Sequence, residues 1–112
     1  MTYSRHPIFF HVNPEMFVTG FVKLNNSSKK RFIDLISSHY FQAFAASNAA
    51  DNVQDYEDDL KTLPQIISLL NKKADQEDLI NKYDISYLAN LLEDNCKTMR
   101  KLIDNRDRIR NK

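Results

Sequence analysis

The chain has 112 residues, of which 42% are hydrophobic, with one glycine, three prolines and one cysteine. This length fits a single domain, residues 1–112, and so little glycine argues against the turn-rich sandwiches and barrels of all-β proteins. A lone cysteine excludes a disulfide framework and a cysteine-based zinc site. We therefore predict an all-α protein with the architecture of a small helical bundle.

Charge is distributed unevenly along the chain, although the formal net charge is only +1. Residues 1–46 carry five Lys and Arg against two Asp and Glu, residues 47–95 carry four against eleven, and residues 96–112 carry seven against two. All seven phenylalanines lie in the first segment. We divide the expected domain into an N-terminal arm (1–12), aromatic-rich helices (13–50) and a charged helical hairpin (51–112).

The N-terminal arm has no helical periodicity, so we expect it to be short and extended. It contains three bulky apolar residues in a row, Ile8, Phe9 and Phe10. Such side chains must be buried, either across the bundle of the same chain or on a partner. Docking within the chain is the more frequent outcome in proteins, and these three residues are the first candidates for partner binding.

A first helix is predicted to start at Asn13-Pro14-Glu15, because Asn suits the N-cap, Pro the first helical position and an acid the first turn. The apolar residues of 17–24 then recur at helical spacing. The alternative is a β-hairpin with strands 8–12 and 16–24, since aromatic and β-branched residues are dense there. The spacing favours the helix.

A second helix is predicted over residues 29–47. Its apolar residues cover more than one face, so we expect it to be the central and most buried helix. It opens with Lys29, Lys30 and Arg31, where the helix dipole disfavours positive charge. These three residues are candidates for binding an anionic partner surface, and an ordinary solvated surface is the alternative interpretation.

The C-terminal half carries two coiled-coil-like apolar seams, which step by three and four residues over 53–74 and 85–109. Pro64 interrupts the first seam and predicts a kink, or a restart of the helix capped by Thr62. With a connector over 75–84, the seams predict a long antiparallel hairpin.

This hairpin would place the acidic run 55–59 beside the basic residues of 97–106, which suits both helix dipoles. Asn95 is a polar residue inside the second seam. It either fixes the register of the hairpin or hydrogen-bonds the carbonyl of Leu60, which Pro64 leaves unpaired.

The basic C-terminal helix is the candidate for nucleic-acid binding, because Lys and Arg spread along a helix can neutralise phosphates. The acidic run of the hairpin competes for the same charges, so pairing within the chain or solvation is the first interpretation. The candidate residues are Lys97, Arg100, Lys101, Arg106, Arg108 and Arg110.

No catalytic or metal-binding pattern is found. The three histidines have no second ligand at metal spacing, and nothing places Cys96 beside a histidine. We therefore expect no enzymatic activity, no cofactor and no metal. The chain has no signal-peptide layout and no apolar run near the roughly 18 residues of a membrane helix, which predicts a cytoplasmic protein without membrane contact.

These observations predict a non-catalytic protein-binding module, such as a small cytoplasmic adaptor, inhibitor or regulator of the kind found among bacterial and phage accessory proteins. A domain of this size buries only about 65% of its surface on folding, so apolar area is left over and a homodimer is expected. The alternative is a nucleic-acid-binding regulator that uses the basic C-terminal helix.

Overall fold

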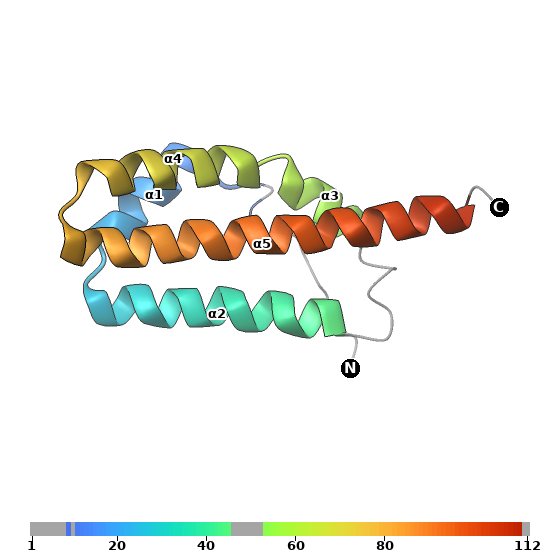
Figure 1. The fold of residues 1–112 in the computed structure, drawn as a ribbon, viewed down its shortest axis with the longest axis horizontal. Helices are drawn as coiled ribbons and strands as arrows, with labels where there is room; N and C mark the ends of the chain where they lie inside the picture. The colour runs from blue at the N-terminus through green and yellow to red at the C-terminus, as the bar shows by residue number, and fades with distance from the viewer. Residues whose placement is uncertain (1–8, 10, 46–52, 111–112) are drawn as a thin grey trace.

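The computed structural model describes Phe9, residues 11–45 and residues 53–110. Within these residues the chain forms five helices and no strand (Figure 1), and the prediction of an all-α protein is confirmed. Ile8 and Phe10 of the predicted arm lie outside the described residues. The helices are α1 (Pro14–Lys23), α2 (Asn26–Ala45), α3 (Val53–Leu60), α4 (Leu63–Gln76) and α5 (Leu79–Arg110).

The start of α1 is the one that the sequence predicts. The side-chain Oδ1 of Asn13 accepts a hydrogen bond of 3.0 Å from the backbone N–H of Met16, and Pro14 and Glu15 follow in the first turn. This bond satisfies one of the N–H groups that a helix start leaves without an internal partner. The alternative of a β-hairpin over residues 8–24 is therefore wrong.

The longest helix, α5, is the centre of the fold. It packs against α2 on one side and against α3 and α4 on the other, whereas α1 packs on α4. Figure 1 shows that α2 and α5 run in the same direction and that α4 runs opposite to both. Our expectation that the second helix is central and most buried is wrong, because α2 packs chiefly on α5 and leaves Leu35 and Phe41 64% and 73% exposed.

The chain breaks between α3 and α4 where Pro64 predicts it. Residues 61 and 62 form a turn, in which the backbone N–H of Thr62 donates to the carbonyl of Asp59 at 3.0 Å. Thr62 occupies the N-cap of α4, but its side chain makes no capping hydrogen bond. The restart of the helix is confirmed, and the side-chain cap is not formed.

The connector before α5 is much shorter than the predicted 75–84. Only Glu77 and Asp78 separate α4 from α5, and Oδ1 of Asp78 accepts a hydrogen bond of 3.0 Å from the backbone N–H of Asn81. Asp78 therefore caps the helix, and α5 begins at Leu79. The apolar seam does not extend into this first turn, so seam periodicity could not reveal it.

One continuous hydrophobic core joins the helices. Along α4 and α5 many of its fully buried residues belong to the predicted seams, but Ile66, Ala89 and Cys96 are buried beside the seams and the seam residue Ile67 is only partly buried. Phe9 also belongs to this core and meets Phe17 edge to face at 5.3 Å between ring centroids. Phe17 in turn contacts Phe32 of α2 at 5.6 Å. Completely buried seam residues are Leu63, Leu70, Ile85, Leu88, Leu92 and Met99.

Candidate functional site

Asp59 on α3 is the most buried charged residue among those that the structure describes, at 2% exposed. Its Oδ2 accepts a hydrogen bond of 2.8 Å from the hydroxyl of Tyr40 on α2, and its Oδ1 accepts one of 2.8 Å from the backbone N–H of Phe9. A buried carboxylate needs such donors to offset the loss of hydration. Asp59 therefore ties three segments together and is a structural residue.

Sequence reasoning placed Asp59 in the acidic run that was expected to face the basic residues of 97–106, and it missed this role. A signal was present: Asp59 follows Tyr56 by three residues, so both lie on the face of α3 that points to the core. Burial raises the pKa of Tyr40, and the charge of Asp59 raises it further. The tyrosine therefore remains a protonated hydrogen-bond donor.

The thiol of Cys96 is not a nucleophile at neutral pH. Its side chain is 1% exposed, and burial raises its pKa to about 11. A protonated, buried thiol is chemically inert. Among the described residues, no group of three or more His, Cys, Asp or Glu side chains could hold a metal ion.

An open groove of about 720 Å³ lies between α1 and α4. Neither histidine nor cysteine is among its lining residues. Its lining residues are Asn13, Pro14, Glu15, Pro64, Gln65, Ser68 and Leu69.

Two of the predicted partner-binding residues are core residues. Phe9 is 1% exposed and Lys29 is 3% exposed. Phe9 has thus docked within its own chain, and Lys29 shares the buried face of α2 with Ile33, one turn further along. Lys30 and Arg31 are exposed, so they alone remain available to a partner among the described members of this set.

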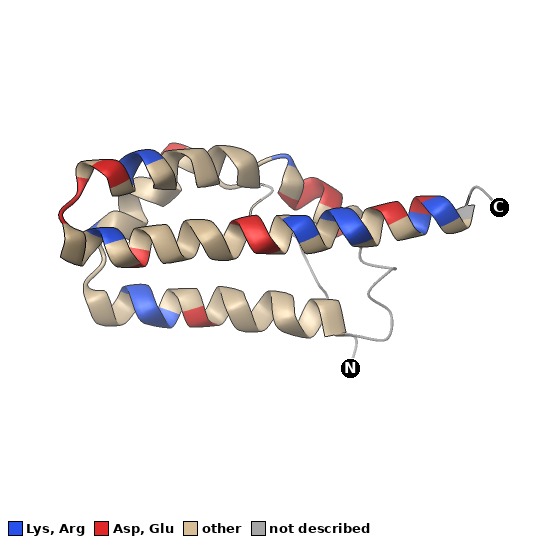
Figure 2. Cartoon of the chain, viewed as in Figure 1, with Lys and Arg blue, Asp and Glu red and all other residues tan. Residues whose placement is uncertain are grey.

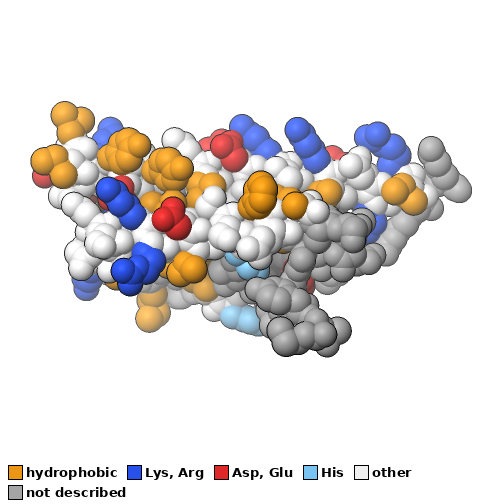
Figure 3. All heavy atoms as spheres, turned by 90° about the horizontal axis from the view of Figure 1, so that it is seen from below, with side chains coloured by type: hydrophobic (Ala, Val, Ile, Leu, Met, Phe, Trp, Pro, Cys, Tyr) orange, Lys and Arg blue, Asp and Glu red, His pale blue; other side chains and the backbone are white. Residues whose placement is uncertain are grey.

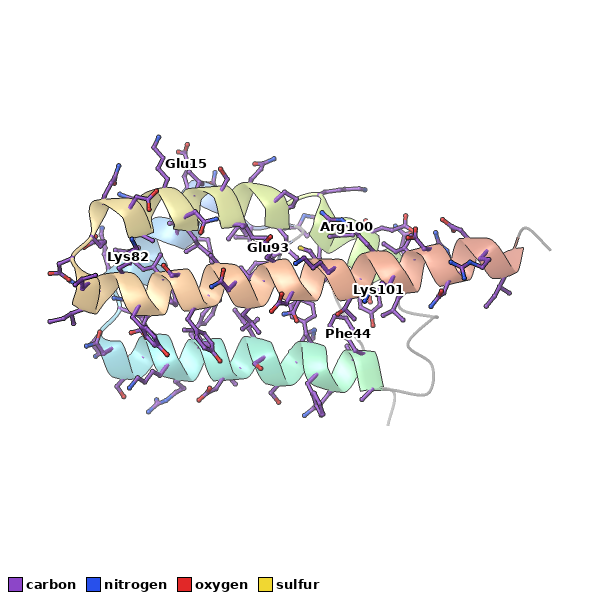
Figure 4. All side chains as sticks on the ribbon, in the orientation of Figure 1. Glu15, Phe44, Lys82, Glu93, Arg100 and Lys101 are labelled. Atoms are coloured by element: carbon purple, nitrogen blue, oxygen red, sulfur yellow. The ribbon has the colours of Figure 1, made fainter. Side chains whose placement is uncertain are left out.

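Figure 2 shows several basic segments along the C-terminal half of α5. Of the predicted basic residues there, Lys97, Arg100, Lys101 and Arg108 are exposed. Figure 4 shows Arg100 on the edge of α5 nearer α3 and Lys101 on the edge nearer α2. The side chain of Arg110 is not described.

Arg106 differs from these residues, because it is engaged within the chain. Its Nη2 lies 2.5 Å from Oε1 of Glu57 on α3 and 3.0 Å from Oδ1 of Asp107.

Near the middle of α5, the Nδ2 atom of Asn95 is buried without a hydrogen-bond partner among the described residues. The expected hydrogen bond from Asn95 to the carbonyl of Leu60 is therefore not formed.

The first three turns of α5 present a surface that sequence reasoning missed. Ile80, Tyr83 and Tyr87 are 76%, 68% and 51% exposed, and the two tyrosine rings lie 6.3 Å apart. Beside them, α2 and α5 enclose a hollow of about 190 Å³, lined by Lys30, Ile33, Asp34, Tyr83, Asp84 and Tyr87. We call the surface formed by Lys30, Asp34, Ile80, Tyr83 and Tyr87 the tyrosine face.

Phe41 continues the tyrosine face along α2. It follows Asp34 by seven residues, so it lies on the same flank of the helix, about 10 Å further along. Leu35 is similarly exposed but lies on the other flank, because it follows Lys30 by five residues. Figure 3, seen from the side of α2, shows apolar side chains in a row with basic and acidic groups among them.

Comparison of the chain with protein-family models, curated proteins and solved structures finds no match. Within the described residues, no helix is both long enough and apolar enough to span a membrane. Because no match suggests a function, we argue one from two features of the described surface, the tyrosine face and the exposed basic residues of α5.

Proposed function

We propose that this protein is a non-catalytic protein-binding module, a small cytoplasmic adaptor, inhibitor or regulator, that binds through the tyrosine face. The observation that carries this proposal is the exposure of Ile80, Tyr83 and Tyr87 on three successive turns of one helix. Tyrosine is enriched at the centres of protein interfaces, where its ring is buried while its hydroxyl finds a polar partner. Two exposed charged groups, Lys30 and Asp34, lie beside the tyrosine rings.

The position of these side chains on helices favours binding. Both tyrosines stand on α5, whose inner face is held by the fully buried Ile85 and Leu88. A binding surface on a packed helix is already ordered, so association does not carry the entropic cost of ordering a loop. Tyrosine adds contact area while losing the freedom of only two side-chain torsions.

We further propose that α3, α4 and α5 act as a charge-matched antiparallel hairpin that holds this platform in place. The ion pair between Glu57 of α3 and Arg106 of α5 supports this proposal at one end. At the other end, Asp75 and Lys82 lie 4.0 Å apart across the turn. Both pairs are partly solvated, so each is expected to fix the register of the helices more than to add stability.

Nucleic-acid binding through the basic end of α5 is the second candidate function. Lys101 follows Lys97 by four residues and Arg108 follows Lys101 by seven, so all three share one flank of the helix. They are exposed, as phosphate contacts require. Asp104 lies on the same flank, and Arg106 is engaged by Glu57, which weakens the case.

Site-specific photo-cross-linking in the cells that make the protein distinguishes these functions. A photoreactive amino acid replaces Tyr83, Lys101 or, as the matched control, the equally exposed Leu35 of the other flank. We expect a protease-sensitive adduct from position 83 only. Adducts that form equally at positions 83 and 35 would contradict the proposal, and a nuclease-sensitive adduct from position 101 would support the alternative.

A further inference from the structure

The exposed charges of the tyrosine face are of opposite sign and lie one helical turn apart on α2. Lys30 and Asp34 are both exposed, and both line the hollow beside Tyr83 and Tyr87. Neither takes part in an ion pair within the part of the chain that the structure describes. The face therefore combines apolar side chains with one exposed cation and one exposed anion that form no ion pair among the described residues, and the buried Asp84 lines the hollow beside them.

Such an arrangement is complementary to itself. In a two-fold dimer the same patch meets itself, so a residue i contacts residue j of the other copy and j contacts i. A two-fold axis midway between Lys30 and Asp34 sets Lys30 against the partner's Asp34, and Asp34 against the partner's Lys30. The rings of Tyr83 and Tyr87 then flank the axis on both copies.

We propose that the tyrosine face binds a second copy of this chain, an inference that rests on the protein-binding function proposed above. Charge distinguishes this face from the other exposed surface of α5. Two basic ends, each with Lys97, Lys101 and Arg108, would repel one another, whereas the tyrosine face brings equal numbers of opposite charges together.

The exposed apolar area of the tyrosine face limits the size of the dimer interface. A fully exposed aromatic side chain offers roughly 200 Å². At exposures of 73%, 68% and 51%, the side chains of Phe41, Tyr83 and Tyr87 offer roughly 400 Å² per copy. With Ile80 and the stem of Lys30, two copies approach the roughly 1,000 Å² at which specific interfaces begin, which corresponds to a weak and reversible dimer.

The test exchanges the two charges and measures association by sedimentation equilibrium in low salt, where exposed charges are not screened. The variants Lys30→Asp and Asp34→Lys each oppose like charges at both contacts of the dimer. We expect each variant alone to have a dissociation constant at least tenfold higher than that of the wild type. An equal mixture of the two should form a heterodimer as tight as the wild-type dimer, because both contacts are again between opposite charges.

The double variant K30D/D34K should likewise recover the wild-type dissociation constant. Lys72→Asp is the matched control, because it makes the same change of charge at an exposed position of α4, across α5 from α2. It should leave association unchanged. Single variants that dimerise as tightly as the wild type, or a mixture that stays monomeric, would overturn the pairing.

Self-association and binding of a different protein through the tyrosine face can be tested separately. A wild-type protein that is monomeric at several hundred micromolar overturns self-association. If position 83 then still cross-links to a different protein, the protein-binding function stands and its partner is not a second copy. If position 83 yields no protein adduct at all, both proposals fall.

Discussion

The hydroxyl of Tyr40 donates a hydrogen bond of 2.8 Å to the buried carboxylate of Asp59, and this bond joins α2 to the break between α3 and α4. The same carboxylate accepts a hydrogen bond from the backbone N–H of Phe9. The attachment of the N-terminal arm, the position of α2 and the path of the chain into α4 therefore depend on one side chain. We call this hydrogen-bonded group the joint. It links α2 to α3, both of these helices pack on α5, and the tyrosine face is formed by α2 and α5.

Tyr40→Phe tests the joint while it preserves the packing of the ring. The variant removes one donor from a buried carboxylate, and we expect the free energy of unfolding to fall by about 1.5–3 kcal/mol. Urea denaturation measures the change. Tyr87→Phe removes the hydroxyl of a half-exposed tyrosine and should cost less than about 0.5 kcal/mol. Equal losses in the two variants would show that the bond to Asp59 is not important for stability.

Ionisation of the Cys96 thiol should make the free energy of unfolding depend on pH in the alkaline range. Burial raises the pKa of its thiol to about 11, Arg100 lowers it and Asp59 raises it. An unfolded thiol titrates near 8.5, so the folded state holds the proton more tightly. The corresponding stability is present below about pH 8.5 and is lost as the pH rises towards 11.

The measurement compares urea midpoints at pH 8 and pH 10.5 for the wild type and Cys96→Ala. Removal of the thiol should make the loss of stability between these pH values smaller by about 1–2 kcal/mol. The pKa of Tyr40 is raised in both proteins, chiefly by burial and by Asp59, and only the smaller contribution of Cys96 is lost in Cys96→Ala. The same pH dependence in the two proteins would contradict the burial of a protonated Cys96.

The acidic residues of α3 should differ in their sensitivity to charge reversal. Glu57→Arg breaks a partly solvated pair with Arg106 and should cost about 0.5–1 kcal/mol, part of which Arg106→Glu in the same chain recovers. Asp59→Lys places a cation at the buried joint and should cost at least about 3 kcal/mol. Chemical denaturation of these three variants measures both effects, and similar losses at positions 57 and 59 would contradict the assigned environments.

Binding of nucleic acid should be weak or undetectable. Among the described residues of this end, Lys97, Arg100, Lys101 and Arg108 are exposed cations, and Asp104 lies among them, so few phosphates could be neutralised. If the basic end did bind, the logarithm of the affinity would fall with the logarithm of salt concentration with a slope of about 0.9 per phosphate. Fluorescence anisotropy with long DNA and RNA at about 50 mM salt measures this. A salt-dependent signal that Lys101→Glu abolishes would favour the alternative function.

Local signals in the sequence predicted much of this fold. Asn13 and Pro14 specify a helix start through backbone groups that lie within a few residues of them, and Pro64 specifies a break for the same reason. Non-local packing could not be inferred in this way. The apolar residues of α2 suggested a central helix, but Leu35 and Phe41 are exposed, and only the arrangement of the helices decides which face is covered.

The candidate site was harder to predict than the fold. Ile80 and Tyr83 follow no apolar seam, so they were assigned to a connector, whereas Asp78 caps a helix that carries them on its surface. Phe9 was a candidate for partner binding because a bulky apolar residue in an arm must be buried, and the sequence does not reveal that Asp59 offers a docking point in the same chain.

We propose that the tyrosine face binds protein and that its partner is a second copy of this chain. Sedimentation equilibrium of the double variant Tyr83→Ala and Tyr87→Ala, beside Leu35→Ala, tests it most directly, since all three side chains are exposed and their loss leaves the core intact. We predict that the wild type and Leu35→Ala form a dimer at high micromolar concentration, whereas the double variant remains monomeric with an unchanged helical circular-dichroism spectrum. A double variant that dimerises as tightly as the wild type would contradict the claim.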